Sequence, residues 1–212
     1  MDVVWNVASA RSTIVGSELS RYVGDVFLRE GEEGRRIAPF LEAGATLLDI
    51  GAGTGFMARW LVRRTGVVPT LTDVVEYGNR DSSLPFLRQA DPLHVPVEDG
   101  SFDVVLLMFV FHHMHDYADQ ERLLEEAKRI AAHRIVIAED TPTSRVDRWF
   151  NVAWDWALNV RHGVPTPFTF RSVEAWTDTF GRHELPVVHK ETYRPMWPTL
   201  GTYHHTLFVL DP

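Results

Sequence analysis

The chain has 212 residues, of which 45 % are hydrophobic and seven are tryptophan, so it can build the core of one folded domain and is not a disordered chain. The formal net charge is −8 and the Lys and Arg residues form no block, which disfavours nucleic acid as the main partner. The absence of cysteine excludes disulfides, a thiolate nucleophile and a cysteine zinc site.

The N-terminus lacks the basic-then-apolar pattern of a secretory signal. The longest apolar run, Val104 to Phe111, is too short to cross a bilayer. We therefore expect a cytoplasmic protein that does not contact membranes.

Residues 1–43 come before the first clearly predicted strand. Apolar residues at helical spacing predict a helix around Leu19–Phe27, and a second short helix is expected over Glu32–Leu41. Either these helices only cover one face of a sheet, or Tyr22 and its neighbours close over a bound ligand as part of a substrate pocket.

The stretch from Thr46 to Ile50 is a short apolar run, which is typical of a strand buried on both faces of a parallel sheet. Glycine then stands at alternate positions, and an amphipathic helix follows. A strand, a glycine turn and a helix present unpaired backbone N–H groups to a ligand. Asp49 repels anions, so it favours a ligand with a cationic or hydroxyl group. The turn consists of Gly51, Ala52, Gly53, Thr54 and Gly55.

The spacing of this turn separates several kinds of nucleotide site. A dinucleotide fingerprint has the pattern G-x-G-x-x-G, and a Walker loop ends in Gly-Lys-Ser/Thr, where this chain has Phe56 and Met57. The segment Asp-Ile-Gly-Ala-Gly-Thr-Gly closely resembles the first motif of class I S-adenosylmethionine-dependent methyltransferases. The resemblance implies that Asp49 and the glycine turn hold the methionine part of S-adenosylmethionine.

A second strand is expected near Val67–Thr72, and Asp73 and Val74 follow it. An acid at the tip of the second strand of a doubly wound sheet reaches the two hydroxyls of a ribose, because a carboxylate can accept from both. The alternative is an exposed turn residue. The glycine turn upstream favours the ribose role for Asp73, with Val74 beside it in the cofactor site.

Residues 74–90 contain too many helix breakers for a full helix. We therefore expect a short second crossover helix or a loop in its place, with a brief third strand near Phe86–Arg88. Asp91 and Pro92 then precede a Phe-Asp strand opening at Phe102, with the spacing of the same methyltransferase family. The resemblance implies that Asp91 accepts from the adenine amine and that Pro92 helps to wall the ring.

The fourth strand, Phe102–Phe109, is an unbroken apolar run that leads to His112 and His113. The carboxyl ends of parallel strands are where α/β proteins place their chemistry. In the resembled family, the residues after this strand lie between the sulfonium of the cofactor and the acceptor. Met108 and Phe109 would line the floor of the cofactor site.

Paired histidines here resemble those of small-molecule O- and N-methyltransferases, in which one of the pair is proposed as general base. A hydroxyl acceptor must lose a proton, and a histidine with a pKa near neutrality can take it. His113 is the first candidate for the base and His112 the second. Alternatively, one histidine caps the following helix and the other shapes the pocket. Together with His115, the pair could form a metal site. Three histidines on one turn rarely all point to the same metal ion, so we expect no metal.

Two acids, Glu139 and Asp140, follow the fifth expected strand, Arg134–Ala138. A clear amphipathic helix, Ala118–Ala131, precedes that strand. The acids therefore face the same crevice as the histidine pair. We expect one of them to orient a catalytic histidine, as carboxylates do in triads, or to bind the acceptor.

Residues 144–171 are an insertion in which Arg145 to Val160 has strong helical character. Trp149 and Trp154 lie on one broad aromatic face, and Asp155 and Asn159 are one turn apart. Such an aromatic face is either part of the core or, as insertions at this place in the family imply, a wall of the acceptor pocket.

A last helix, Ser172–Phe180, and an antiparallel strand pair, Pro186–Tyr193 and Tyr203–Leu210, complete the chain. We predict one α/β domain with a Rossmann-like class I methyltransferase fold, whose seven-stranded sheet is mostly parallel with an antiparallel last strand. Its expected parts are an N-terminal helical cover (1–43), a cofactor-binding core (44–143), the acceptor-side insertion (144–171) and the C-terminal helix and strand pair (172–212).

The predicted function is methyl transfer from S-adenosylmethionine to an oxygen or nitrogen of a small organic acceptor, with S-adenosylhomocysteine as product, by a monomer or homodimer. A protein or peptide methyltransferase is an alternative and would have an open acidic groove. A non-catalytic cofactor-binding regulator and a nicotinamide-dependent oxidoreductase are the others. The G-x-G-x-G spacing and the acids at 49, 73 and 91 argue against these two.

Overall fold

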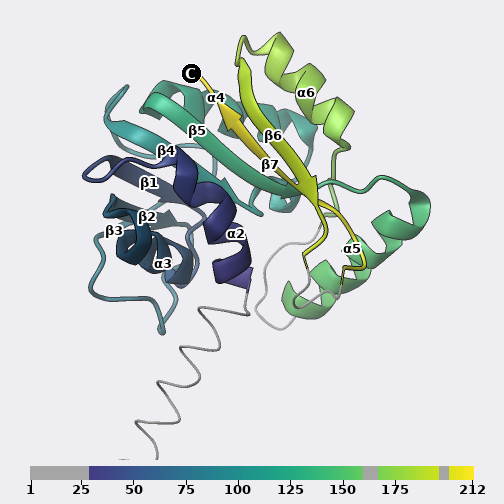
Figure 1. Ribbon diagram of the computed structural model, residues 1–212, viewed down its shortest axis with the longest axis horizontal. Helices are drawn as coiled ribbons and strands as arrows, with labels where there is room; N and C mark the ends of the chain where they lie inside the picture. The colour runs from purple at the N-terminus through teal and green to yellow at the C-terminus, as the bar shows by residue number, and fades with distance from the viewer. Residues whose placement is uncertain (1–28, 160–166, 196–200) are drawn as a thin grey trace, which may run out of the picture.

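The computed structural model describes residues 29–159, 167–195 and 201–212 (Figure 1). One seven-stranded sheet has the strand order β3-β2-β1-β4-β5-β7-β6. Six strands run parallel to one another, and β7 is antiparallel to its neighbours β5 and β6. The strands are β1 (Thr46–Ile50), β2 (Val68–Asp73), β3 (Phe86–Arg88), β4 (Phe102–Met108), β5 (Ala131–Asp140), β6 (Val187–Tyr193) and β7 (His205–Leu210).

The predicted sheet, including the antiparallel last strand, is therefore confirmed. The described helices are α2 (Arg29–Ile37), α3 (Phe56–Thr65), α4 (Tyr117–Ile130), α5 (Arg145–Asn159) and α6 (Val173–Arg182), with short 3₁₀ turns η1 (Ala38–Phe40) and η2 (Phe111–His113). The helix expected around Leu19–Phe27, with Tyr22, lies outside the described residues. Within the described ranges, no helix has the length and hydropathy that a bilayer span requires.

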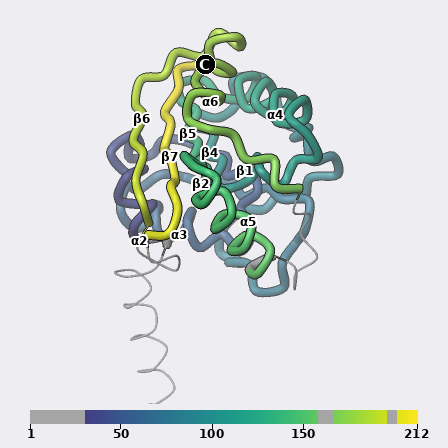
Figure 2. Tube along the Cα trace, turned by 90° about the vertical axis from the view of Figure 1, so that its right-hand side faces the viewer, coloured from purple at the N-terminus to yellow at the C-terminus, as the bar shows by residue number. Residues whose placement is uncertain are grey.

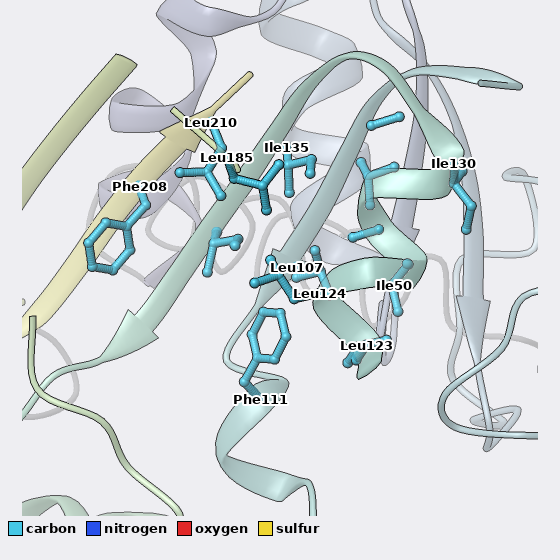
Figure 3. Close-up of a cluster of buried hydrophobic side chains, with 14 of the residues drawn as sticks. Ile50, Leu107, Phe111, Leu123, Leu124, Ile130, Ile135, Leu185, Phe208 and Leu210 are labelled. Carbon is cyan, nitrogen blue, oxygen red and sulfur yellow. The ribbon is translucent and has the colours of Figure 1, made fainter. Parts of the chain in front are cut away.

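The sheet separates two hydrophobic clusters because its strands are buried on both faces. On one face, α4 and α6 cover strand residues such as Leu107 and Phe208, and Phe111 of η2 closes this cluster (Figure 3). On the other face, Ile37 of α2 and Trp60 of α3 pack against the alternate strand residues. This doubly wound arrangement leaves the carboxyl ends of the parallel strands as the edge where loops gather.

No helix connects β2 to β3, as the helix breakers of this segment predict. The loop that replaces it folds back on the glycine turn. The backbone N–H of Asp81 donates to the carbonyl of Thr54 (3.0 Å), and Arg59 donates to the Asp81 carboxylate (3.2 Å). The loop therefore holds the glycine turn from outside, where the missing helix would have packed.

Helix α5 lies at the end of the sheet where β7 begins (Figure 1 and Figure 2). Its inward face is polar, because Asp147, Asn151 and Asp155 are at most 5 % exposed. Trp149 is 64 % exposed and Trp154 is only half-buried, so the interpretation of these tryptophans as part of the core is wrong, and their role as a wall of the acceptor pocket stays a prediction.

The physical reason is that α5 lies over strand ends and loops, where polar groups need hydrogen-bond partners. Asp147 accepts from the backbone N–H of Thr143 (2.8 Å) and contacts Nδ1 of His204 (2.7 Å). Hydrogen bonding thus decides which face of α5 turns inward. Trp149 and Trp156 are left exposed on the outer face.

Candidate active site

The three glycines of the turn after β1 all have positive φ. A Cβ on Gly51 would lie 2.5 Å from Cγ2 of Val110, and one on Gly55 would lie 2.6 Å from Cδ1 of Leu71. A Cβ on Gly53 would meet nothing within 4 Å in the described part of the chain. Gly51 and Gly55 therefore allow close packing, whereas Gly53 faces the space where a ligand would sit.

Asp73 connects the end of β2 to the glycine turn by a hydrogen bond. Its carboxylate accepts from the backbone N–H of Gly53 (2.9 Å) and from that of Val75 (3.0 Å). A carboxylate has about four lone-pair sites, so capacity remains for the hydroxyls of a ribose. The neighbouring Val74 is exposed, beside the turn, together with Phe56.

Asp49 is buried at the end of β1, and its pKa is raised to about 7. Burial is the larger cause, and the nearby charge of Asp73 adds to it. A buried carboxyl beside another acid is relieved by a cationic partner, so the site fits the ammonium group of a methionine moiety. Ala52 and Thr54 complete this turn through backbone contacts with β2 and with the loop before β3.

The other expected cofactor residues lie along the same edge. Asp91 and Pro92 are exposed, and the Asp91 carboxylate accepts from the N–H of Leu93 (2.8 Å). Met108 is half-buried, and Phe109 is buried with a positive φ of 56°. The structure thus places all of them at the carboxyl ends of β1, β2, β3 and β4.

His112 is buried and held by Glu139. Nδ1 of His112 lies 2.8 Å from Oε2 of Glu139, while Oε1 accepts from the backbone N–H groups of Val110 (2.7 Å) and Phe111 (2.8 Å). On the other side, Nε2 of His112 lies 3.7 Å from Oδ1 of Asp155. Glu139 therefore fixes the backbone of η2 as well as the ring, which makes it a positioning residue.

The pKa of His112 is raised to about 9. Burial lowers it, but the charges of Glu139, Asp140 and Asp155 and the hydrogen bond to Glu139 outweigh burial. At neutral pH His112 is therefore an imidazolium and has no lone pair with which to take a proton. The raised pKa of His112 therefore favours His113 over His112 as the candidate base.

The side chain of Asp116 caps α4 through the N–H of Asp119 (2.9 Å), so the expectation that one histidine of the pair caps this helix is wrong, while a role in shaping the pocket stays a prediction. His113 is half-buried, and its ring centroid lies 4.2 Å from that of His112. One potential ligand atom each of His112, His113 and Asp155 lies within 4.8 Å of the others. These three residues could hold a metal ion only if His112 lost its proton.

A second buried histidine lies beside Asp140. Nε2 of His205 is 2.9 Å from Oδ1 of Asp140, and its Nδ1 is 2.9 Å from Oε1 of Glu33 on α2. Burial lowers the pKa of His205, but both carboxylates raise it to about 9. The ring of Phe109 lies 4.6 Å from the imidazole.

Sequence reasoning missed His205, Glu33 and Asn151. No local pattern marks His205 or Glu33, whose contact joins residues 172 positions apart. Asn151 had a visible signal, because Asp147, Asn151 and Asp155 repeat at intervals of four. The side chain of Asn159 and the whole of Tyr22 lie outside what the structure describes.

The chain matches the family of methyltransferase domains over residues 22–189, which is more than half of its length. Methyltransferase GfsG of Streptomyces halstedii is 29 % identical over 147 residues, which cover 63 % of this chain and 49 % of that protein. The chain thus spans about half the length of this curated relative.

Solved structures share the fold at low sequence identity. A chain of the complex between the Haloferax volcanii Trm112 methyltransferase activator and a methyltransferase has a TM-score of 0.68 and 19 % identity, covering 92 % of this chain and 94 % of that chain. Geranyl diphosphate C-methyltransferase from Streptomyces coelicolor A3(2) has a TM-score of 0.64 and 14 % identity, covering 86 % and 79 %.

The sheet order, the glycine turn and the buried acids are those of the class I S-adenosylmethionine-dependent methyltransferases. The chain belongs to this class through its methyltransferase domain. The open space at Gly53 and the raised pKa of Asp49 fit S-adenosylmethionine, the cofactor of the class.

Proposed function

We propose that the protein transfers a methyl group from S-adenosylmethionine to an oxygen or nitrogen of a small organic acceptor. The observation that carries this proposal is the closeness of the glycine turn to the histidine pair. Gly51 packs directly on Val110, which lies two residues before His112. A ligand on the turn and an acceptor at η2 would therefore meet at one place, and methyl transfer needs this alignment above all.

Different residues of the chain would bind the cofactor and take the proton from the acceptor. Asp49 and the glycine turn bind the amino acid part of the cofactor, Asp73 binds the ribose, and Asp91 binds the adenine. Bound S-adenosylmethionine supplies an electrophilic methyl group on its sulfonium. His113 takes the proton from the acceptor's hydroxyl or amine, because its neighbour His112 already carries a proton.

A small acceptor is favoured over a protein or peptide by the burial of the acids on this side. Glu139, Asp140 and Asp155 are at most 6 % exposed, so they do not form an open acidic groove. A peptide would need such a groove along the surface.

Calorimetry with S-adenosylhomocysteine tests the cofactor part of the proposal. We expect wild type to bind, and Asp73→Ala to weaken binding about tenfold or more, which is about 1.4 kcal/mol. Asp178→Asn on the exposed surface of α6 is the control and should bind like wild type. Binding of NAD in place of S-adenosylhomocysteine would contradict the proposal.

His113→Gln tests the chemical step. We expect turnover of any accepted hydroxyl or amine compound to fall roughly 100-fold or more, since general base catalysis contributes this much. The affinity for S-adenosylhomocysteine should stay unchanged, because His113 faces the acceptor. Unchanged turnover would show that the histidine only shapes the pocket.

A further inference from the structure

Asn151 is fully buried on the inward face of α5. Neither its amide oxygen nor its amide nitrogen has a hydrogen-bond partner among the residues that the structure describes. Leaving a buried amide without partners costs stability, so such a group calls for an explanation, such as a ligand that supplies the missing partners.

The position of Asn151 points to the acceptor side of the site. It lies four residues from both Asp147 and Asp155, so these three side chains share one face of α5. Asp147 contacts His204 at the start of β7, and Asp155 approaches His112 in η2. Asn151 therefore lies on the helix between these two contacts.

A second buried amide shows what a purely structural role looks like in this protein. Gln120 on α4 is also fully buried. Its Nε2 donates to the carbonyls of Phe111 (2.9 Å) and Thr169 (2.7 Å), and its Oε1 accepts from Nε of Arg171 (2.7 Å). Every polar atom of Gln120 is used, whereas both polar atoms of Asn151 are left over.

We propose that Asn151 binds the methyl acceptor and that this acceptor is an uncharged hydroxylated compound. The inference rests on the proposed function. A hydroxyl can donate to the amide oxygen and accept from the amide nitrogen, so one group satisfies both. The buried carboxylates of Glu139, Asp140 and Asp155 would repel a carboxylate or phosphate on the acceptor, so anionic acceptors are excluded.

Asn151 is closed to water, so the proposal requires α5 to shift outward when the acceptor binds. Trp149 and Trp156 on the outer face of this helix are 64 % and 56 % exposed, so they do not anchor it by packing. The inward face, in contrast, is held at the two ends by Asp147 and Asp155. An acceptor hydroxyl at Asn151 would add a contact in the middle.

Asn151→Leu and Gln120→Leu form the first test, because both replace a buried amide by an apolar side chain. We expect the Tm of unliganded Asn151→Leu to equal or exceed that of wild type, and the Tm of Gln120→Leu to fall by about 4 °C or more. A comparable fall for Asn151→Leu would mean that its amide is satisfied within the fold, and would overturn the proposal.

The second test uses two matched pairs of acceptors, catechol with protocatechuate and glucose with glucuronate. With S-adenosylmethionine, we expect wild type to release S-adenosylhomocysteine with a neutral member and not with its anionic partner. Asn151→Leu should lose at least about tenfold in kcat/KM while binding S-adenosylhomocysteine as wild type does. Turnover unchanged in Asn151→Leu, or a preference for the anions, would overturn the inference and leave the proposed function intact. If wild type binds S-adenosylhomocysteine but methylates none of these compounds, the result would contradict the proposed function, and this inference would fall with it.

Discussion

The cofactor side and the acceptor side of this site are built in different ways. On the cofactor side, the contact from Gly53 to Asp73 joins residues 20 positions apart and uses a backbone N–H group. On the acceptor side, the contact from Glu33 to His205 joins residues 172 positions apart and uses two buried side chains. The first side depends on the local shape of one turn, and the second on the packing of the whole domain.

The charges differ as well. The cofactor side holds two buried acids, Asp49 and Asp73, and the raised pKa of Asp49 leaves it ready for a cationic ligand. The acceptor side holds two imidazolium groups, His112 and His205, each between two carboxylates. The four carboxylates outnumber the two imidazolium groups, so negative charge remains on the acceptor side although each histidine is paired within the protein. On the cofactor side, the positive partner of Asp49 would come from the ligand. The comparison can be tested on each side.

The largest effect is expected for Gly53→Ala. The new Cβ would enter the open space of the turn, so we expect affinity for S-adenosylhomocysteine to fall about 100-fold, or about 2.7 kcal/mol. Gly100→Ala is the matched control, since Gly100 also has a positive φ and a Cβ there would meet none of the described atoms within 4 Å. Both variants carry the same backbone strain of roughly 1–2 kcal/mol. Equal binding by the two variants, measured by calorimetry, would refute the role of Gly53.

A smaller effect is expected from the charge of Asp49. Because its pKa is about 7, most of the carboxyl is neutral at pH 6 and ionised at pH 8. Affinity for S-adenosylhomocysteine should therefore rise about tenfold between these pH values, and Asp49→Asn should bind weakly with no such rise. An unchanged pH dependence in Asp49→Asn would assign the titration to another group.

The same variant has a consequence for stability. A carboxyl with a raised pKa in the folded state destabilises the free protein progressively as pH rises from its unfolded value toward about 7. Unliganded Asp49→Asn should therefore have a higher Tm than wild type at pH 8 and not at pH 4. Thermal denaturation at the two pH values checks this directly.

The smallest of these effects is expected on the acceptor side, from His205→Gln. The pKa of His205 rises from 6.5 to about 9 on folding, so its contribution to stability is fully present below pH 6.5 and is lost as pH rises through 9. We expect the variant to have a Tm lower by a few degrees at pH 6, with the difference shrinking by pH 10. His133→Gln, at an exposed position, is the control for the loss of an imidazole.

The same contrast explains what could be predicted from the sequence. The glycine turn and Asp73 were recognisable because a short pattern and a short separation define them. The sheet followed from apolar runs and from turn residues. The inner face of α5 was not predicted, because tryptophans at helical spacing suggested burial while hydrogen bonds decided its orientation.

The acceptor side could be predicted only in part. His112, Glu139 and Asp140 follow predicted strand ends, so their common location was foreseeable. The charge state of His112 was not, because it depends on Asp155 from a distant helix. Asn151 has an unsatisfied amide, and only a three-dimensional count of hydrogen bonds reveals it.

The two edges of the sheet bear on how the protein avoids aggregation. At one edge, β3 has only three residues, and the loop before it ends at Pro85. At the other edge, β6 carries Lys190 and Glu191 and has an irregular register next to Val187. Short, charged or irregular edge strands resist the addition of another strand. Neither edge is a good template for joining sheets of two molecules, which keeps a long, apolar parallel sheet from polymerising.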